Sequence, residues 1–327
     1  AALAAQVVVE SDAVIVLGPI FASSIGAAGP ILNAADLMLI GFSTDNAVAG
    51  NGRYIMGFSL EDEVRAVLSH AASEGHERFA ALIPEGVYGN RVYSALGDVI
   101  EEQRLALSAV ESYPPDTSLV FDPVERLADY KARKRAMDEE MAALSDIETD
   151  MTDDIIKQLE KQEVIGDPDY SAVLIPEGGD LLRTIAPLLP FYEVDPAKVQ
   201  FLGTGLWNDP GLTKEPPLNG AWFAAPNPEA PNAFFERYRK TFDTPAPRIA
   251  TLAYDAMAMV ASLARMPVVE DRFTRQSLED MRGFKGIDGV FRFKPSGVAE
   301  RNLAIIQINR DGFTVVRDAV PAFALFR

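Results

Sequence analysis

The chain of 327 residues has no cysteine, two histidines and two tryptophans. The lack of cysteine excludes disulfides, thiol catalysis and thiolate metal sites. No apolar run approaches the roughly 20 residues that a membrane helix requires, so we expect a soluble mature chain. The formal net charge of −18 repels phosphate backbones, which argues against nucleic acid as a partner.

Signatures of catalysis are also scarce. The two histidines, His70 and His76, belong to one predicted helix and its end, and no motif surrounds either of them. We expect both to be exposed helix residues, because a lone histidine has no partner for acid–base work. No HExxH, Walker, GxSxG, dinucleotide-binding or spaced calcium motif is present. The sequence therefore predicts a protein that is not an enzyme and holds no cofactor or metal.

The string Leu-Ile-Pro-Glu-Gly occurs twice, at 82–86 and at 174–178. Each copy ends an apolar run and begins a helical pattern. A short apolar run bounded by proline and glycine is typical of a strand that is buried on both faces in a parallel sheet. Open α/β sheets bind their ligands where such strands end and helices begin. The repeat therefore indicates loops that hold a small ligand.

Strands and helices alternate along almost the whole chain, which predicts an α/β fold with parallel sheets. The predicted strands cover residues 13–17, 37–40, 79–83, 172–175, 199–202, 221–224, 290–293 and 303–308. The predicted helices begin near Ser24 and Ser59 and cover 92–103, 180–189, 234–242 and 251–265. Ser23 or Ser24 is a plausible N-cap for the first of them.

Residues 123–163 differ from the rest because they are rich in charged residues and alanine and contain no glycine and no proline after Pro123. Apolar residues at helical spacing predict an inserted helical hairpin that is broken near residues 145–153. The charges of this insert are typical of a solvated face.

The order of these elements resembles that of the type I periplasmic binding proteins, the family of Leu/Ile/Val receptors. The segments that carry the resemblance are 16–19, 39–44, 88–89, 201–203, 254–256 and 286–293. The loop at 42–45, the charged insert and residues 202–207 look more narrowly like the bacterial penicillin-binding protein activators, which are lipoproteins of the same fold.

The resemblance implies two doubly wound parallel-sheet lobes joined by three crossings, near Gly57, Ala225 and Phe293. Lobe one would comprise residues 1–57 and 226–292, and lobe two would comprise 58–225 and 293–327, with the insert 123–163. Closure about the hinge on a ligand is then expected. The resemblance also implies that a strand, a helix and a second strand precede Ala1. Because Ala1 is not methionine, we expect that an upstream segment was removed.

The resemblance places ligand contacts on Ser23, Ser24, Ser43, Thr44 and Asp45, where hydroxyls and free backbone N–H groups would hold a carboxylate. For the serines and the threonine, the alternative is helix capping.

Aromatic residues supply the other predicted contacts. Tyr88 would face the ligand across the cleft, or would instead lie under its own loop. Trp207 follows a strand and could stack on a ligand. Tyr254 has the same potential, but together with Met257 and Val260 it fits a core-facing helical stripe better.

Glu85 and Glu177 occupy equivalent positions of the repeated string. Most often a glutamate after proline is a solvated turn residue. Either glutamate could instead hold a ligand ammonium group. Two carboxylates that face one cleft could also form a glycosidase pair, which is the most distant alternative.

Two functions fit this fold. The first is a periplasmic, lipid-anchored activator of peptidoglycan synthesis that contacts a synthase, which the charged insert favours. The second is the substrate-binding protein of an ABC importer for branched-chain or other amino acids, which delivers its ligand to a permease. A polar cleft lined by Ser43, Thr44 and Tyr88 favours this second function.

Overall fold

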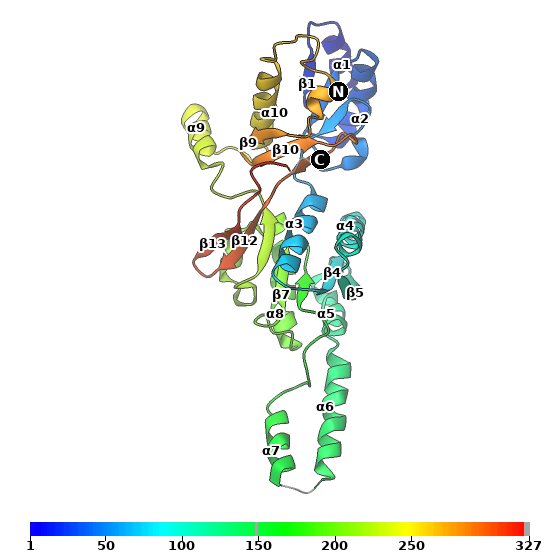
Figure 1. The fold of residues 1–327 in the computed structure, drawn as a ribbon, viewed down its shortest axis with the longest axis vertical. Coiled ribbons are helices and arrows are strands. Elements are labelled where there is room, and N and C mark those ends of the chain that lie inside the picture. The colour runs from blue at the N-terminus through cyan, green and yellow to red at the C-terminus, as the bar shows by residue number, and fades with distance from the viewer. Residues whose placement is uncertain (148–149, 324–327) are drawn as a thin grey trace. The chain divides into compact units, whose positions relative to one another are not determined.

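The computed structural model describes residues 1–147 and 150–323 (Figure 1). Contacts between Cα atoms divide the chain into two compact units. The first unit comprises Ala1–Asp62, Ala225–Ala304 and Arg317–Arg327, and the second comprises Glu63–Ala224 and Ile305–Val316. The two lobes and the hinge that the resemblance implies stay a prediction. None of the described helices is both long and apolar enough to cross a membrane.

The first unit contains two small sheets. The parallel sheet has the order β1–β2–β3, and the antiparallel sheet has the order β11–β10–β9. The strands are β1 (Ile15–Leu17), β2 (Met38–Gly41), β3 (Arg53–Ile55), β9 (Phe284–Gly286), β10 (Gly289–Phe293) and β11 (Ala299–Arg301). The helices are α1 (Ala2–Val9), α2 (Ala22–Ala34), α9 (Asn232–Phe242), α10 (Ala250–Leu263) and α11 (Arg275–Leu278), with the 3-10 turn η1 (Asn46–Val48). The antiparallel sheet was not predicted.

Strand β2 separates two apolar clusters of this unit, because successive side chains of a strand point to opposite faces. Leu39 packs with Ile25 and Leu32 of α2. The next residue, Ile40, belongs to a second cluster that includes Leu252 of α10. Both faces of the parallel sheet are therefore covered, which is usual for parallel sheets.

The second unit is built on one seven-stranded sheet with the order β13–β12–β8–β7–β6–β4–β5. The strands are β4 (Arg78–Pro84), β5 (Ala106–Tyr113), β6 (Ala172–Leu174), β7 (Gln200–Gly203), β8 (Trp222–Ala225), β12 (Ala304–Asn309) and β13 (Gly312–Arg317). The helices are α3 (Leu60–Ser73), α4 (Val87–Gln103), α5 (Phe121–Leu127), α6 (Tyr130–Ser145), α7 (Asp150–Leu159) and α8 (Gly179–Phe191). Short 3-10 turns are η2 (Thr117–Leu119), η3 (Gly205–Trp207), η4 (Pro210–Lys214) and η5 (Pro216–Leu218).

The two copies of the repeated string leave the sheet side by side. Strands β4 and β6 pair in parallel, with Ala81 opposite Leu174. Residues 79–83 and 172–175 are buried, as expected for strands covered on both faces. Helices α4 and α8 begin directly after the two strings. The α/β fold with mostly parallel strands, predicted from the alternation of elements, is therefore confirmed.

Three local expectations were wrong. Helix α2 begins at Ala22 and its N-cap is Phe21, so neither Ser23 nor Ser24 caps it. His70 is not exposed but buried against the ring of Trp222, with 4.7 Å between ring centroids. Tyr254 faces outward from α10, because the buried face of that helix runs through Leu252, Ala256 and Met259 instead.

Candidate functional site

The strand ends of the second unit bring five polar residues into one group, which we call the polar edge. Its members are Glu63 of α3, Tyr88 of α4, Tyr113 at the end of β5, Glu177 after β6 and Thr204 after β7. The carboxyl ends of parallel strands meet at one edge of a sheet, and the helices that follow begin there. The fold thereby unites residues that are up to 141 positions apart, from 63 to 204.

Tyr88 and Thr204 place two hydroxyl groups close together at this edge. The Tyr88 hydroxyl lies 3.5 Å from Oγ1 of Thr204, and either atom could donate. Burial raises the pKa of Tyr88 to about 12, and the charges of Glu63 and Glu177 raise it further, against the contact with Thr204 that lowers it. The Tyr88 phenol is therefore neutral at physiological pH and keeps a proton to donate.

Glu177 is fixed by two hydrogen bonds. Its carboxylate accepts one from the hydroxyl of buried Tyr113, at 2.8 Å, and one from the backbone N–H of Gly178, at 2.9 Å. Burial is the main cause that raises the pKa of Tyr113, and the Glu177 carboxylate adds to it. The carboxylate thus has a defined orientation at the edge.

Glu63 supplies the second carboxylate of the group. Its Oε2 atom accepts a 2.9 Å hydrogen bond from the backbone N–H of Gly205. A Cβ atom at Gly205 would lie 2.5 Å from Oε1 of Glu63, closer than non-bonded contacts allow. A larger residue at this position would have to displace the Glu63 carboxylate.

Trp207 lies beneath this group. The structure buries the ring completely, so it offers no surface on which a ligand could stack. Its indole N–H donates a 2.9 Å hydrogen bond to the carbonyl oxygen of Glu177. Because a Cβ atom at Gly203 would lie 2.0 Å from the buried indole ring, glycine is required at the end of β7. Trp207 supports the loop that carries Glu177.

The predicted contacts in the first unit make local hydrogen bonds. Oγ of Ser43 accepts from the backbone N–H of Asp45, and the Asp45 carboxylate accepts from Ala47 and caps η1. Ser43 and Thr44 line a cavity of only about 10 Å³. Asp45 thus caps η1, whereas Ser43 accepts a hydrogen bond within its own turn. Whether they and Thr44 also contact a ligand stays a prediction.

Ser23 and Ser24 lie in the first turn of α2. Ser23 is exposed, whereas Ser24 lines an apolar groove of about 390 Å³ beside α1. Most other residues of this groove are alanine, valine and leucine. A carboxylate would find few hydrogen-bond donors there, and the ligand role of both serines stays a prediction.

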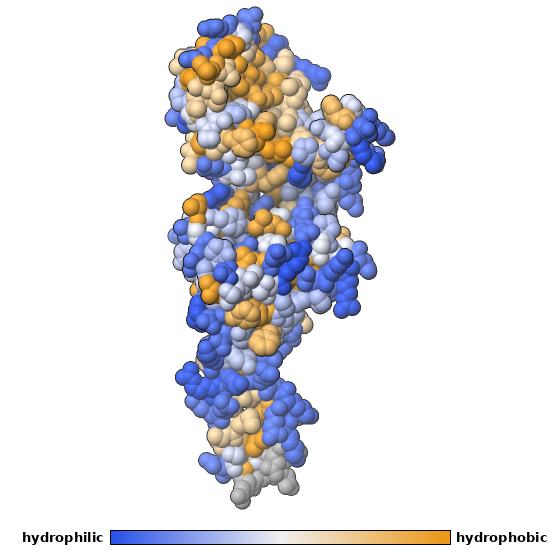
Figure 2. All heavy atoms as spheres, turned by 180° about the vertical axis from the view of Figure 1, so that it is seen from behind, coloured by the Kyte–Doolittle hydropathy of each residue, from blue (hydrophilic) through white to orange (hydrophobic). Residues whose placement is uncertain are grey.

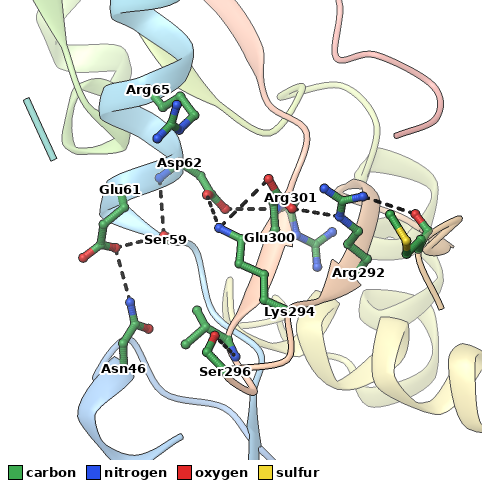
Figure 3. A network of polar contacts seen from close by, with 12 residues as sticks. Asn46, Ser59, Glu61, Asp62, Arg65, Arg292, Lys294, Ser296, Glu300 and Arg301 are labelled. Carbon is green, nitrogen blue, oxygen red and sulfur yellow. Dashed lines mark hydrogen bonds and ion pairs between the residues drawn. The ribbon is translucent and has the colours of Figure 1, made fainter. Parts of the chain in front are cut away.

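A network of charged and polar side chains lies near the start of α3 (Figure 3). Ser59 caps the helix by accepting from the N–H of Asp62, and its hydroxyl donates to Glu61, which also accepts from Asn46. The buried Asp62 carboxylate accepts a 3.0 Å hydrogen bond from the backbone N–H of Arg301. All of these residues belong to the first unit, in which the network joins the residues that begin α3 to strand β11.

Glu85, the counterpart of Glu177 in the repeated string, has an exposed side chain. Its backbone N–H donates to the carbonyl oxygen of Tyr113 at 2.8 Å. The exposed side chain is what a solvated turn residue would show. The two glutamates therefore lie in different surroundings, although their local sequences are identical.

Sequence reasoning missed three members of the polar edge. Thr204 directly follows an apolar strand, and that position was a usable signal. Glu63 and Tyr113 carried no such signal, because only the pairing of β4 with β5 and the path of α3 bring them to this edge.

Comparisons with known proteins agree with this fold. A search of curated protein sequences gives no match. Among solved structures, a protein described as a branched-chain amino acid ABC transporter from Rhodospirillum rubrum is 15% identical, with a TM-score of 0.69; the match covers 96% of this chain and 83% of that one.

Two further structures contain ligands. An ABC transporter substrate-binding protein from Desulfitobacterium hafniense in complex with Leu is 17% identical, with a TM-score of 0.59, and the match covers 96% of this chain and 84% of that one. A solute-binding protein from Rhodopseudomonas palustris in complex with 3,4-dihydroxybenzoic acid is 14% identical, with a TM-score of 0.56, and the match covers 99% and 82%. Identities this low show a common fold.

The profile of the periplasmic binding protein family matches residues 1–313. This span takes in nearly the whole chain, including the polar edge. The chain belongs to the type I periplasmic binding protein family, a family of ligand-binding receptors.

Proposed function

We propose that this protein is a periplasmic receptor that binds a small, amino-acid-like ligand and delivers it to an ABC importer. The observation that carries the proposal is the polar edge, which joins two oriented carboxylates, Glu63 and Glu177, to the neutral hydroxyl of Tyr88. The family and the ABC transporter proteins of similar fold support it.

The chemistry of the polar edge favours a ligand that donates hydrogen bonds. Carboxylates accept from ammonium groups, and such charge-assisted bonds are stronger than bonds between neutral groups. The hydroxyls of Tyr88 and Thr204 can each donate or accept. We propose Glu177 as the contact for a ligand ammonium group, and Ser43, Thr44 and Asp45 of the first unit as further ligand contacts.

Thermal unfolding in the presence of free amino acids, and in parallel of benzoates, tests this function. A ligand present at 100 times its Kd adds about 2.7 kcal/mol to the free energy of unfolding. We expect stabilisation by an amino acid, and we expect Glu177→Gln to weaken it by roughly tenfold or more, because the charged partner of the ammonium group is lost. Stabilisation by benzoates alone would contradict an ammonium contact.

Tyrosine variants on one helix provide a matched control. Tyr88→Phe removes a hydroxyl of the polar edge and should weaken ligand binding by about five- to tenfold. Tyr93→Phe removes an exposed hydroxyl of the same helix and should leave binding unchanged. Equal affinities in both variants, or no stabilisation by any amino acid, would overturn the assignment.

One feature favours a second function, activation of peptidoglycan synthesis through contact with a synthase. Helices α6 and α7 form a paired, charged extension that a transport receptor does not need. Retention of a peptidoglycan synthase by the whole protein, lost on deletion of residues 123–163, would favour this function. Attachment to the membrane by a lipid remains part of that proposal. Turnover of a chromogenic glycoside that is abolished by Glu85→Gln would contradict both functions.

A further inference from the structure

Within the second unit, helices α6 and α7 extend away from the sheet as an antiparallel pair (Figure 1). The outer end of this pair exposes apolar side chains amid acidic ones, and we call it the hairpin tip. Its members are Glu139, Glu140, Asp146, Ile147, Met151 and Ile155. None of them belongs to the polar edge, so the proposed ligand site leaves this surface unexplained.

The hairpin has a fixed base. Buried Arg133 of α6 donates to the carbonyl oxygens of Ala128 and Glu193, both at 3.2 Å, and to that of Gly166, at 2.5 Å. Tyr130 closes the base through a 2.9 Å hydrogen bond to Glu163. These bonds join α6 to segments before α6 and after α7. The base of the hairpin is therefore held in place by hydrogen bonds to neighbouring segments of the second unit.

Apolar residues of α7 differ in exposure. Ile156 and Leu159 are half-buried, consistent with the contact between α6 and α7. Met151 and Ile155, four residues apart and thus on one helical face, are 74% and 39% exposed. Ile147, just after α6, is 53% exposed. Apolar side chains also interrupt the hydrophilic surface of the hairpin in the space-filling view (Figure 2). Packing within the hairpin does not account for the outer face.

Charge at this end is of one sign. Residues 137–156 include eight acidic residues and no basic one, whereas residues 130–136 include four basic residues and no acidic one. Glu139 and Glu140 lie in the acidic half of α6, which leads to its C-terminus. They add negative charge around the exposed apolar side chains of the tip.

We propose that the hairpin tip is a docking surface for a partner protein that presents an apolar depression bordered by lysine and arginine. Met151, Ile155 and Ile147 would enter the depression, and Glu139, Glu140 and Asp146 would face the basic border. Apolar anchors surrounded by complementary charge are typical of specific interfaces, and the charges speed association. An anionic membrane and a second copy of this chain, with a net charge of −18, would both be repelled.

Binding of a designed probe to the whole protein tests the proposal. The probe is a helical peptide of leucine and lysine, labelled for fluorescence anisotropy. We expect it to bind, and we expect the tip variant Met151→Ser/Ile155→Ser to weaken binding by about tenfold. Glu139→Gln/Glu140→Gln should weaken binding by about threefold at low salt and have little effect at high salt.

Matched variants elsewhere in the second unit separate the tip from the rest of this acidic protein. Leu119→Ser/Val316→Ser removes two apolar side chains of comparable exposure, 53% and 40%, and should leave binding unchanged. Asp98→Asn/Glu101→Gln removes two exposed carboxylates of α4 and should have a smaller effect than the glutamate pair of the tip. Far-UV circular dichroism would establish that each variant is folded.

Several results would overturn the docking surface. One is equal loss of peptide binding in the tip variant and in its matched control. Another is equally tight binding of a leucine and glutamate peptide. Tip-dependent binding to vesicles of anionic phospholipid would show that the tip binds a membrane and not a protein. Tip-dependent dimerisation in sedimentation velocity would show that the tip binds a second copy of this chain.

Discussion

The indole N–H of Trp207 donates a 2.9 Å hydrogen bond to the carbonyl oxygen of Glu177. This bond ties the turn after β7 to the turn after β6, which are adjacent strands of one sheet. The fully buried tryptophan thus holds the backbone of a residue whose carboxylate we assign to the ligand. The organisation of the polar edge therefore depends on packing directly beneath it.

Trp207→Phe should lower the free energy of unfolding by about 1–3 kcal/mol, because a carbonyl oxygen loses its donor and the ring is smaller. Urea denaturation would measure the change. Trp222→Phe is the matched control, since the Trp222 indole N–H has no hydrogen-bond partner in the described part of the chain. An equal loss in both variants would show that the hydrogen bond contributes little.

Gly203→Ala should destabilise the second unit by about 1–3 kcal/mol, because the added methyl group would lie 2.0 Å from the Trp207 ring. Gly97→Ala places a methyl group in open space within α4 and should stabilise the protein by roughly 0.5–1 kcal/mol. Thermal or urea unfolding of the two variants should give changes of opposite sign. Tolerance of alanine at Gly203 would contradict the described packing.

Asp255→Ala should cost about 3–5 kcal/mol, because it leaves the charge of Arg301 buried and without its carboxylate. The two side chains form a 3.0 Å ion pair with exposed fractions of only 1% and 0%. Glu102→Ala breaks the exposed pair with Arg65 and should cost less than about 1 kcal/mol. Similar losses in the two variants, measured by urea unfolding, would argue against a buried pair.

Asp62 should make stability depend on pH. Burial is the main cause that raises the pKa of Asp62 from 3.8 to about 6; Glu300 and Glu61 add to it, and Lys294 and the Arg301 N–H oppose it. The folded protein thus retains a proton that the unfolded chain releases between about pH 4 and pH 6. The resulting stability is present below about pH 4 and is lost as the pH rises through 6.

Asp62→Asn removes this titration. Relative to the unaltered protein, the variant should gain up to about 3 kcal/mol between pH 4 and pH 7, since each pKa unit corresponds to about 1.4 kcal/mol. Urea unfolding at both pH values would measure the difference, with Asp98→Asn as the exposed control. A difference between Asp62→Asn and the unaltered protein that stays constant with pH would refute the raised pKa.

The ends of the main strands could be predicted from local sequence, whereas the surroundings of single side chains could not. The strings at 82–86 and 174–178 end neighbouring parallel strands, as their apolar runs indicated. Their glutamates nevertheless differ, since Glu177 accepts from Tyr113 and Glu85 is exposed. Identical strings carry no information about which strand lies beside them.

Trp207 and His70 show the same limit. Trp207 was expected to be accessible because it follows a strand in a loop, and His70 because it lies on a predicted helix with no motif around it. The structure buries Trp207 under the Glu177 turn and packs His70 against Trp222, which lies 152 positions further along the chain. Burial of a side chain depends on contacts made at long sequence separation, and no local pattern records them.

The sequence by itself determined the α/β class, the ends of the main strands and the two helical stripes of the insert, because these depend on periodicity and on local proline and glycine. Tertiary structure alone decided that Glu63, Tyr113 and Glu177 share one edge and that Met151 and Ile155 face outward. The physical reason is that periodicity fixes how side chains alternate within one element. The order of strands in the sheet and the pairing of helices decide which elements meet.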